Sequence, residues 1–233
     1  MNRRRTTKAI AATLGLTSLI ALGAAGSASA ETIVLGSAAP AKAACPSNCL
    51  VEANVTGYQT AISGAQNPFV VPASGNLVAW SLKLGFPKKP DRRSFNDAFG
   101  TPTARLAVLR RVPGSDKPFK YKLLRQSPLQ NLGKFFGDVT TFNLTQALPV
   151  KKNDVVALTI PTWAPALALG QPNSSTWLSS RRATKKRGGC TEDGGGANVD
   201  AGAAQVKKGS QRPYGCSYSG ARLLYSAQFV SDL

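Results

Sequence analysis

The chain has 233 residues, carries 29 Lys and Arg against 11 Asp and Glu for a formal net charge of +18, and contains no histidine. The absence of histidine excludes Ser-His-Asp and Cys-His catalysis and His-ligated zinc sites. The length suits one domain. The excess of cations favours an anionic partner such as a polysaccharide, a cell-wall polymer, nucleic acid or a membrane surface, with solubility alone as the alternative.

Residues 1–30 have the three parts of a secretory signal peptide in the order that defines one. A basic start at residues 2–5 precedes an apolar centre at residues 9–25, and Ala28-Ser29-Ala30 follows. We expect cleavage after Ala30, which removes four cations and leaves a net charge of +14. No later segment is long and apolar enough to span a membrane. The sequence therefore predicts a secreted or cell-surface protein.

Residues 31–44 are rich in Ala, Gly, Ser and Pro, so we expect a flexible leader, with an edge strand at 32–35 as the alternative. The folded domain is predicted over 45–233. Within it, residues 50–57 alternate apolar and polar side chains, which is typical of a strand with one face in water.

The central prediction concerns residues 68–84, PFVVPASGNLVAWSLKL, as two strands joined by a tight turn at 72–75. Trp80 is its largest core candidate. Residues 85–103 contain four cations, three prolines and three phenylalanines, and they predict a long, anchored loop. A hairpin is predicted over 103–126.

Further strands are predicted over 138–144, 154–160 and 221–230, and almost no helical periodicity appears after the signal. The run at 154–160 is continuously apolar, which suits a strand buried on both faces. Strands separated by turn signals predict an all-β fold, a two-sheet antiparallel sandwich with long loops.

Several segments of this pattern resemble secreted jelly-roll-like β-sandwich proteins of soil actinobacteria. They are residues 69–80 (FVVPASGNLVAW), 106–110 (LAVLR), 127–130 (SPLQ), 148–158 (LPVKKNDVVAL) and the closing strand. The resemblance implies a jelly-roll-like fold and secretion, and it transfers no activity. Where that pattern carries Gly before Asp, this chain has Asn153, which also tolerates a left-handed backbone.

Four cysteines in an exported chain predict two disulfides, with three possible pairings. We favour Cys45–Cys49 and Cys190–Cys216 because each pair lies together in the sequence. The Gly-rich stretch between Cys190 and Cys216 is acidic at 191–196 and at Asp200, but it lacks the ligand spacing of an EF-hand loop. The sequence predicts no metal site and no cofactor.

Two cationic runs are the candidate sites for an anionic polymer, with solvated loops as the alternative. Two tryptophans expected in loops are candidates for stacking on a carbohydrate. The cations are Lys88, Lys89, Arg92, Arg93, Arg181, Arg182, Lys185, Lys186 and Arg187, and the tryptophans are Trp163 and Trp177. We expect neutralisation of the second run to leave thermal stability nearly unchanged. Too few aromatic residues accompany the cations to predict specific binding of nucleic acid.

Three functions fit these features. The first is a non-catalytic module that binds an extracellular polysaccharide or other anionic polymer. The second is a carboxylate-dependent polysaccharide hydrolase or lyase, although no catalytic motif and no marked carboxylate pair supports it. The third is a structural surface or matrix protein that associates through open sheet edges.

Overall fold

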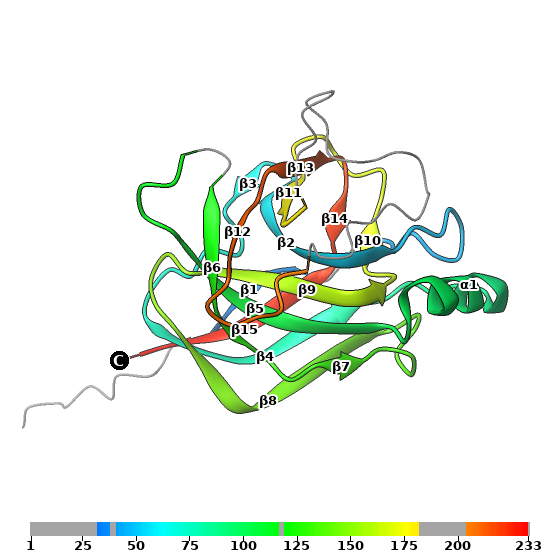
Figure 1. The fold of residues 1–233 in the computed structure, drawn as a ribbon, viewed down its shortest axis with the longest axis horizontal. Coiled ribbons are helices and arrows are strands. Elements are labelled where there is room, and N and C mark those ends of the chain that lie inside the picture. Colours follow the sequence, from blue (N-terminus) through cyan, green and yellow to red (C-terminus); the bar gives the residue numbers. More distant parts are fainter. Residues whose placement is uncertain (1–31, 38–40, 117–118, 182–203, 233) are drawn as a thin grey trace, which may run out of the picture.

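The computed structural model describes residues 32–37, 41–116, 119–181 and 204–232. Over these residues the chain forms 15 strands and one helix (Figure 1). A four-stranded and a nine-stranded antiparallel sheet pack face to face. The predicted all-β sandwich is confirmed. The predicted signal peptide lies outside the described residues.

The four-stranded sheet has the order β1-β15-β4-β8. Its strands are β1 (Thr32–Gly36), β15 (Tyr225–Ser231), β4 (Gly75–Lys83) and β8 (Val139–Val150). The expectation of a loose leader is wrong for residues 32–36, because β1 pairs with β15 along its whole length and buries Leu35 in the core. Strand β8 runs on to Val150, beyond its predicted end at 144.

The larger sheet has the order β12-β6-β5-β9-β2-β11-β13 and curls strongly. Its strands are β12 (Gln211–Pro213), β6 (Lys120–Gln126), β5 (Thr103–Arg111), β9 (Val155–Ala164), β2 (Glu52–Ile62), β11 (Thr176–Ser179) and β13 (Cys216–Ser219), with β3 (Ala65–Gln66) beside β2 and β7 (Gln130–Asn131) beside β5. Two short strands, β10 (Leu167–Ala168) and β14 (Arg222–Leu223), pair separately. The hydroxyls of Tyr58 on β2 and Tyr121 on β6 lie 2.7 Å apart although two strands separate β2 from β6.

The main core fills the space between the sheets. Trp80 is fully buried there, as predicted, and Phe69 stacks on Tyr225 with ring centroids 4.1 Å apart. Burial of such side chains is the dominant stabilising contribution, at about 25 cal/mol per Å² of apolar surface.

A second core lies inside the curl of the larger sheet, around Tyr58, Tyr121 and Tyr214. Gln205 closes it, since its side-chain amide donates to the backbone oxygens of Tyr121 and Ser210 and its side-chain oxygen accepts from the Tyr214 hydroxyl. The prediction that the strand at 50–57 has one face in water is wrong, because on that face Glu52 is buried against Arg181, Thr56 is buried against Gln205, and only Asn54 is half-buried.

Two further local predictions need correction, and one is confirmed. Residues 69–71 do not form a hairpin with β4, because their backbone bonds with residues 153–156 instead. Residues 85–103 contain an eleven-residue helix, α1 (Lys89–Phe99), where a loop was predicted. Pro90 lies in the first turn of the helix, where the backbone N–H that proline lacks would have no intrahelical acceptor. Gly100, with a φ of 83°, ends the helix. The predicted hairpin at 103–126 is confirmed as β5 and β6.

Candidate functional site

Helix α1 lies at one end of the sandwich, beyond the last residues of β9 (Figure 1). Its anchor is Trp163 on β9, which is fully buried. The Trp163 indole Nε1 donates to the Gly100 carbonyl at 2.8 Å and to Asn96 Oδ1 at 3.1 Å. The rings of Phe95 and Phe136 pack against the indole, with centroids 5.1 and 5.5 Å away. The helix is therefore held to the sheet by packing and by hydrogen bonds at its C-terminal end.

The prediction that Trp163 and Trp177 stack on a carbohydrate is wrong in this structure. Both lie in strands and not in loops, and their exposed fractions are 0% and 1%. The Trp177 ring is stacked on Tyr218 with centroids 4.3 Å apart. Both strands are covered on the side where the indole lies. Burial of the large apolar indole surface is more favourable than its exposure to solvent.

The first cationic run does come together on the surface, at the start of α1. Lys88, Lys89 and Arg93 are exposed, and Arg92 is half-buried. The Arg92 guanidinium carbon lies 5.4 Å from the ring centroid of Phe86 and 5.9 Å from that of Phe136. Within the described residues, none of these four cations forms an ion pair with a carboxylate.

Phe86 is the aromatic residue that this end of the sandwich exposes, with 51% of its surface accessible. It rests on Gly137, where an added Cβ would lie 3.3 Å from the Phe86 ring, and Gly137 has a φ of 91°. We call Phe86, Lys88, Lys89, Arg92 and Arg93 the α1 platform. Sequence reasoning missed Phe86 because nothing in its neighbours marks which of three nearby phenylalanines stays exposed.

The predicted Cys45–Cys49 disulfide is confirmed, and Cys45 lies against Gly85, the residue before Phe86. Gly85 packs so closely on it that an added Cβ would lie 2.8 Å from the Cys45 Cβ. The Gly85 N–H donates to the Pro165 carbonyl at 2.7 Å, and the Gly85 carbonyl accepts from the Gly137 N–H at 3.1 Å. The backbone that carries Phe86 is therefore fixed on both sides.

The second cationic run behaves differently at Arg181, its one described member. Arg181 is largely buried and donates to Glu52 Oε2 at 2.7 Å, to the Tyr218 hydroxyl at 3.1 Å and to the Ala53 carbonyl at 3.2 Å. Burial alone would lower the pKa of Arg181, but the Glu52 charge and the Tyr218 hydroxyl outweigh it, so the pKa is raised.

Arg181 is therefore engaged within the fold, and its prediction as a polymer-binding residue is wrong. Its ion pair with Glu52 also favours a loss of stability on its neutralisation, unlike the small effect expected for the whole run. The remaining members of the run, Arg182, Lys185, Lys186 and Arg187, lie outside the described residues. So do Cys190, with its predicted bond to Cys216, and the acidic stretch 191–200. Cys216 itself is buried on β13.

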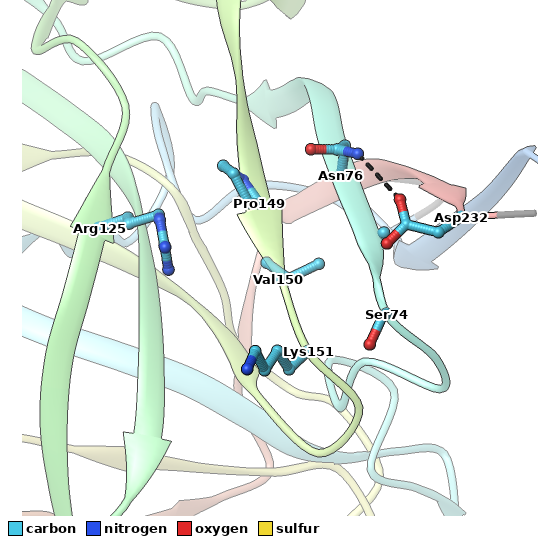
Figure 2. A pocket seen from close by; sticks show the side chains of 8 residues that line it. Ser74, Asn76, Arg125, Pro149, Val150, Lys151 and Asp232 are labelled. Atoms are coloured by element: carbon cyan, nitrogen blue, oxygen red, sulfur yellow. Dashed lines mark hydrogen bonds between the residues drawn. The ribbon is translucent and has the colours of Figure 1, made fainter.

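A third group of polar side chains gathers at the opposite end of β9, where a hollow of about 250 Å³ opens (Figure 2). Arg125 of β6 and Lys151, after β8, contribute the cations, and Pro149 and Val150 lie between them and Asn76 (Figure 2). Ser74, Gly75 and Asp232 complete the lining. Sequence reasoning missed this site because its residues are spread from position 74 to position 232 and no local motif connects them.

In the part of the chain that the structure describes, no three His, Cys, Asp or Glu side chains are grouped as a metal site requires. No helix in this part is both long and apolar enough to cross a membrane.

No protein-family model, curated protein or solved structure matches this chain. A function has to be argued from its own surface.

Proposed function

We propose that the protein is a secreted, non-catalytic module that binds an anionic extracellular polysaccharide or a similar acidic polymer at the α1 platform. One observation carries the proposal: four cations without carboxylate partners among the described residues lie at the start of an anchored helix, next to the exposed ring of Phe86, and one of them, Arg92, lies 5.4 Å from that ring. The cations attract acidic groups through the release of counterions. The Phe86 face offers an apolar surface to a sugar ring.

The rigidity of the α1 platform supports this proposal. Binding costs less entropy when the contacting groups are already held in place. Here Trp163 anchors the helix, and Gly137 and the Cys45–Cys49 disulfide support the Phe86 segment. A mobile loop with the same charges would lose conformational entropy on binding, whereas the residues of the α1 platform are already ordered in the folded protein.

The experiment is a titration of the protein with an acidic polysaccharide and with a neutral polysaccharide of similar backbone, each at low and at high salt. We expect binding of the acidic polymer that weakens as salt rises, and weaker, salt-independent binding of the neutral one. Indifference to both polymers would overturn the proposal. If the acidic and the neutral polysaccharide bound equally well and independently of salt, stacking on Phe86 would account for binding and the cations would have no role in it.

The structural alternative, a surface or matrix protein that self-associates, is favoured by a separate observation. The four strands β1, β15, β4 and β8 contain one charged residue, Lys83, although the chain carries 29 Lys and Arg. Strands β1 and β8 form the two edges of that sheet, and neither contains a charged residue, although Pro149 interrupts the last part of β8. Uncharged edges favour pairing with another chain.

Sedimentation at rising concentration tests this alternative, with Asn143→Lys on β8 as the variant that places a charge on the edge strand. Self-association would be supported if the mass of the unmodified protein rose with concentration and the mass of the variant stayed lower at the same concentration. A constant monomer mass would remove it.

The hydrolase or lyase alternative gains no support from the described residues. Of the carboxylates there, Glu52 and Asp154 are buried, and each holds an arginine. Tyr218 does lie beside Arg181, as a lyase base would, but burial raises the pKa of Tyr218 to about 12 despite the nearby guanidinium. A phenol with a raised pKa stays protonated and is a poor base at neutral pH.

A further inference from the structure

The hollow at the start of β9 carries an inference that does not depend on the α1 platform. Its lining combines two cations, three polar side chains and an apolar floor within one small space. Arg125 lies on one side of Pro149 and Val150, and Asn76 with Asp232 lies on the other (Figure 2). Ser74 and Lys151 border the lower part of the same space in that view.

The cations of the hollow are available to a ligand. In the described part of the chain, neither Arg125 nor Lys151 forms an ion pair. The nearest turn carboxylate, Asp154, is fully buried and already accepts from Arg110 at 2.6 and 2.8 Å and from the Lys151 backbone N–H at 2.9 Å. It therefore offers no further charge to neutralise the Lys151 ammonium.

The opposite side of the hollow suits hydroxyl groups. Asp232 Oδ1 accepts from Asn76 Nδ2 at 3.2 Å, which orients both side chains and leaves the second carboxylate oxygen as an acceptor. Ser74 adds a hydroxyl. A plain inorganic anion would gain from the cations and be repelled by Asp232. A ligand with one carboxylate and several hydroxyls uses both sides, and Pro149 offers an apolar surface to its ring carbons.

We propose that this hollow binds a single acidic sugar unit, with its carboxylate toward Arg125 and Lys151 and its hydroxyls toward Ser74, Asn76 and Asp232. The volume of about 250 Å³ suits one ring and not an oligosaccharide. The class of ligand is a uronic acid, either free or as the end of a chain.

The test uses free galacturonate as the probe and galactose, the same ring without the carboxylate, as its control. No tag is placed directly after Asp232, because Asp232 lines the hollow. Backbone amide shifts at residues 74–76, 150 and 151 are expected to saturate with millimolar galacturonate and to stay unchanged with galactose. Inorganic sulfate, which offers charge without hydroxyls, is expected to bind more weakly than galacturonate.

The variants Arg125→Gln and Lys151→Gln are each expected to weaken galacturonate binding about tenfold, the effect of losing one charge-assisted hydrogen bond. Lys122→Gln and Lys152→Gln are matched controls, because both are exposed cations, one on the same strand as Arg125 and one next to Lys151, and neither lines the hollow. These controls are expected to bind as the unmodified protein does, and so is a variant with the α1 platform neutralised. Thermal unfolding confirms that each variant is folded.

Three results would overturn the assignment. If the amide shifts did not saturate with galacturonate, the hollow would not be a site for this ligand. Equal losses in the lining and control variants would reduce the effect to net charge. Sulfate binding as tight as that of galacturonate would make the hollow a simple anion site without sugar recognition.

Discussion

Two cationic runs that look alike in the sequence have opposite structural roles. At the α1 platform, Lys88, Lys89 and Arg93 are exposed on a helix and have no carboxylate partner in the described part of the chain. At the start of the second run, Arg181 is buried against Glu52 and Tyr218. A basic run is therefore a candidate binding surface only where no carboxylate on a neighbouring strand neutralises it.

The largest expected effect comes from breaking the buried pair. Arg181→Met leaves the Glu52 carboxylate buried beside an apolar side chain, and such a change costs about 3–5 kcal/mol of unfolding free energy. Arg93→Met, the matched change on the α1 platform, is expected to stay within about 0.5 kcal/mol of the unmodified protein. Urea unfolding measures both.

A rescue variant sharpens this comparison. Replacing Glu52 and Arg181 together with Leu and Met removes both charges, and most of the lost stability is expected to return. If Arg181→Met unfolds at the same urea concentration as Arg93→Met, the contrast between the two runs fails.

Alkaline pH is expected to destabilise the buried region. Burial raises the pKa of Tyr58, Tyr214, Tyr218 and Tyr225 above the ordinary value of 10.0, and that of Tyr218 reaches about 12. Because the folded state holds these protons more tightly than the unfolded state does, the stabilisation is complete below pH 10 and is lost as the pH rises toward 12 and beyond. Phenolate absorbance and circular dichroism, recorded together, are expected to change in one step. Ionisation of these phenols well before unfolding would contradict the burial.

A smaller effect is expected at the anchor of the α1 platform. Trp163→Phe removes the donor to the Gly100 carbonyl and to Asn96, and it should cost about 1–2 kcal/mol. Amide hydrogen exchange in residues 89–99 is expected to quicken more than exchange in β9. If amide exchange quickened equally in residues 89–99 and in β9, the helix and the sheet would open together, and Trp163 would not be a local anchor of the helix.

The smallest change concerns Phe86. Phe86→Ala is expected to weaken binding of an acidic polysaccharide several-fold, because the lost ring face contributes about 1 kcal/mol and also supports the Arg92 guanidinium. The salt dependence of binding is expected to stay the same because no charge is removed. A lowered salt dependence would show that Phe86 acts only by positioning Arg92.

The sequence supports the fold better than the sites, for reasons that particular residues make plain. The turn signal and the flanking strand patterns identified β5 and β6, and a continuous apolar run identified β9, because such patterns reflect local burial. The helix at Lys89–Phe99 was missed because none of its residues is buried, so no apolar stripe marks it. It is held by Trp163, which is more than sixty positions away from Asn96 in the helix and from Gly100 directly after it, the two residues that accept from the indole.

The same limit applies to the sites. The burial of Arg181 depends on Glu52, 129 positions away in the chain, and the hollow joins Arg125 of the larger sheet to Asp232, which follows β15 of the four-stranded sheet. No local pattern encodes these pairings. The left-handed backbone predicted as tolerable at Asn153 is present, with a φ of 69°, because a turn conformation is a local property.

The salt dependence of binding to an acidic polysaccharide tests the central claim most directly. The triple variant Lys88→Gln, Lys89→Gln, Arg93→Gln is compared with Lys122→Gln, Lys152→Gln, Lys207→Gln, which removes the same charge from exposed positions elsewhere. We expect the first triple variant to lower the slope of log affinity against log salt by about two to three, and the second to leave it unchanged. Equal slopes in the two triple variants would contradict the α1 platform as the binding site.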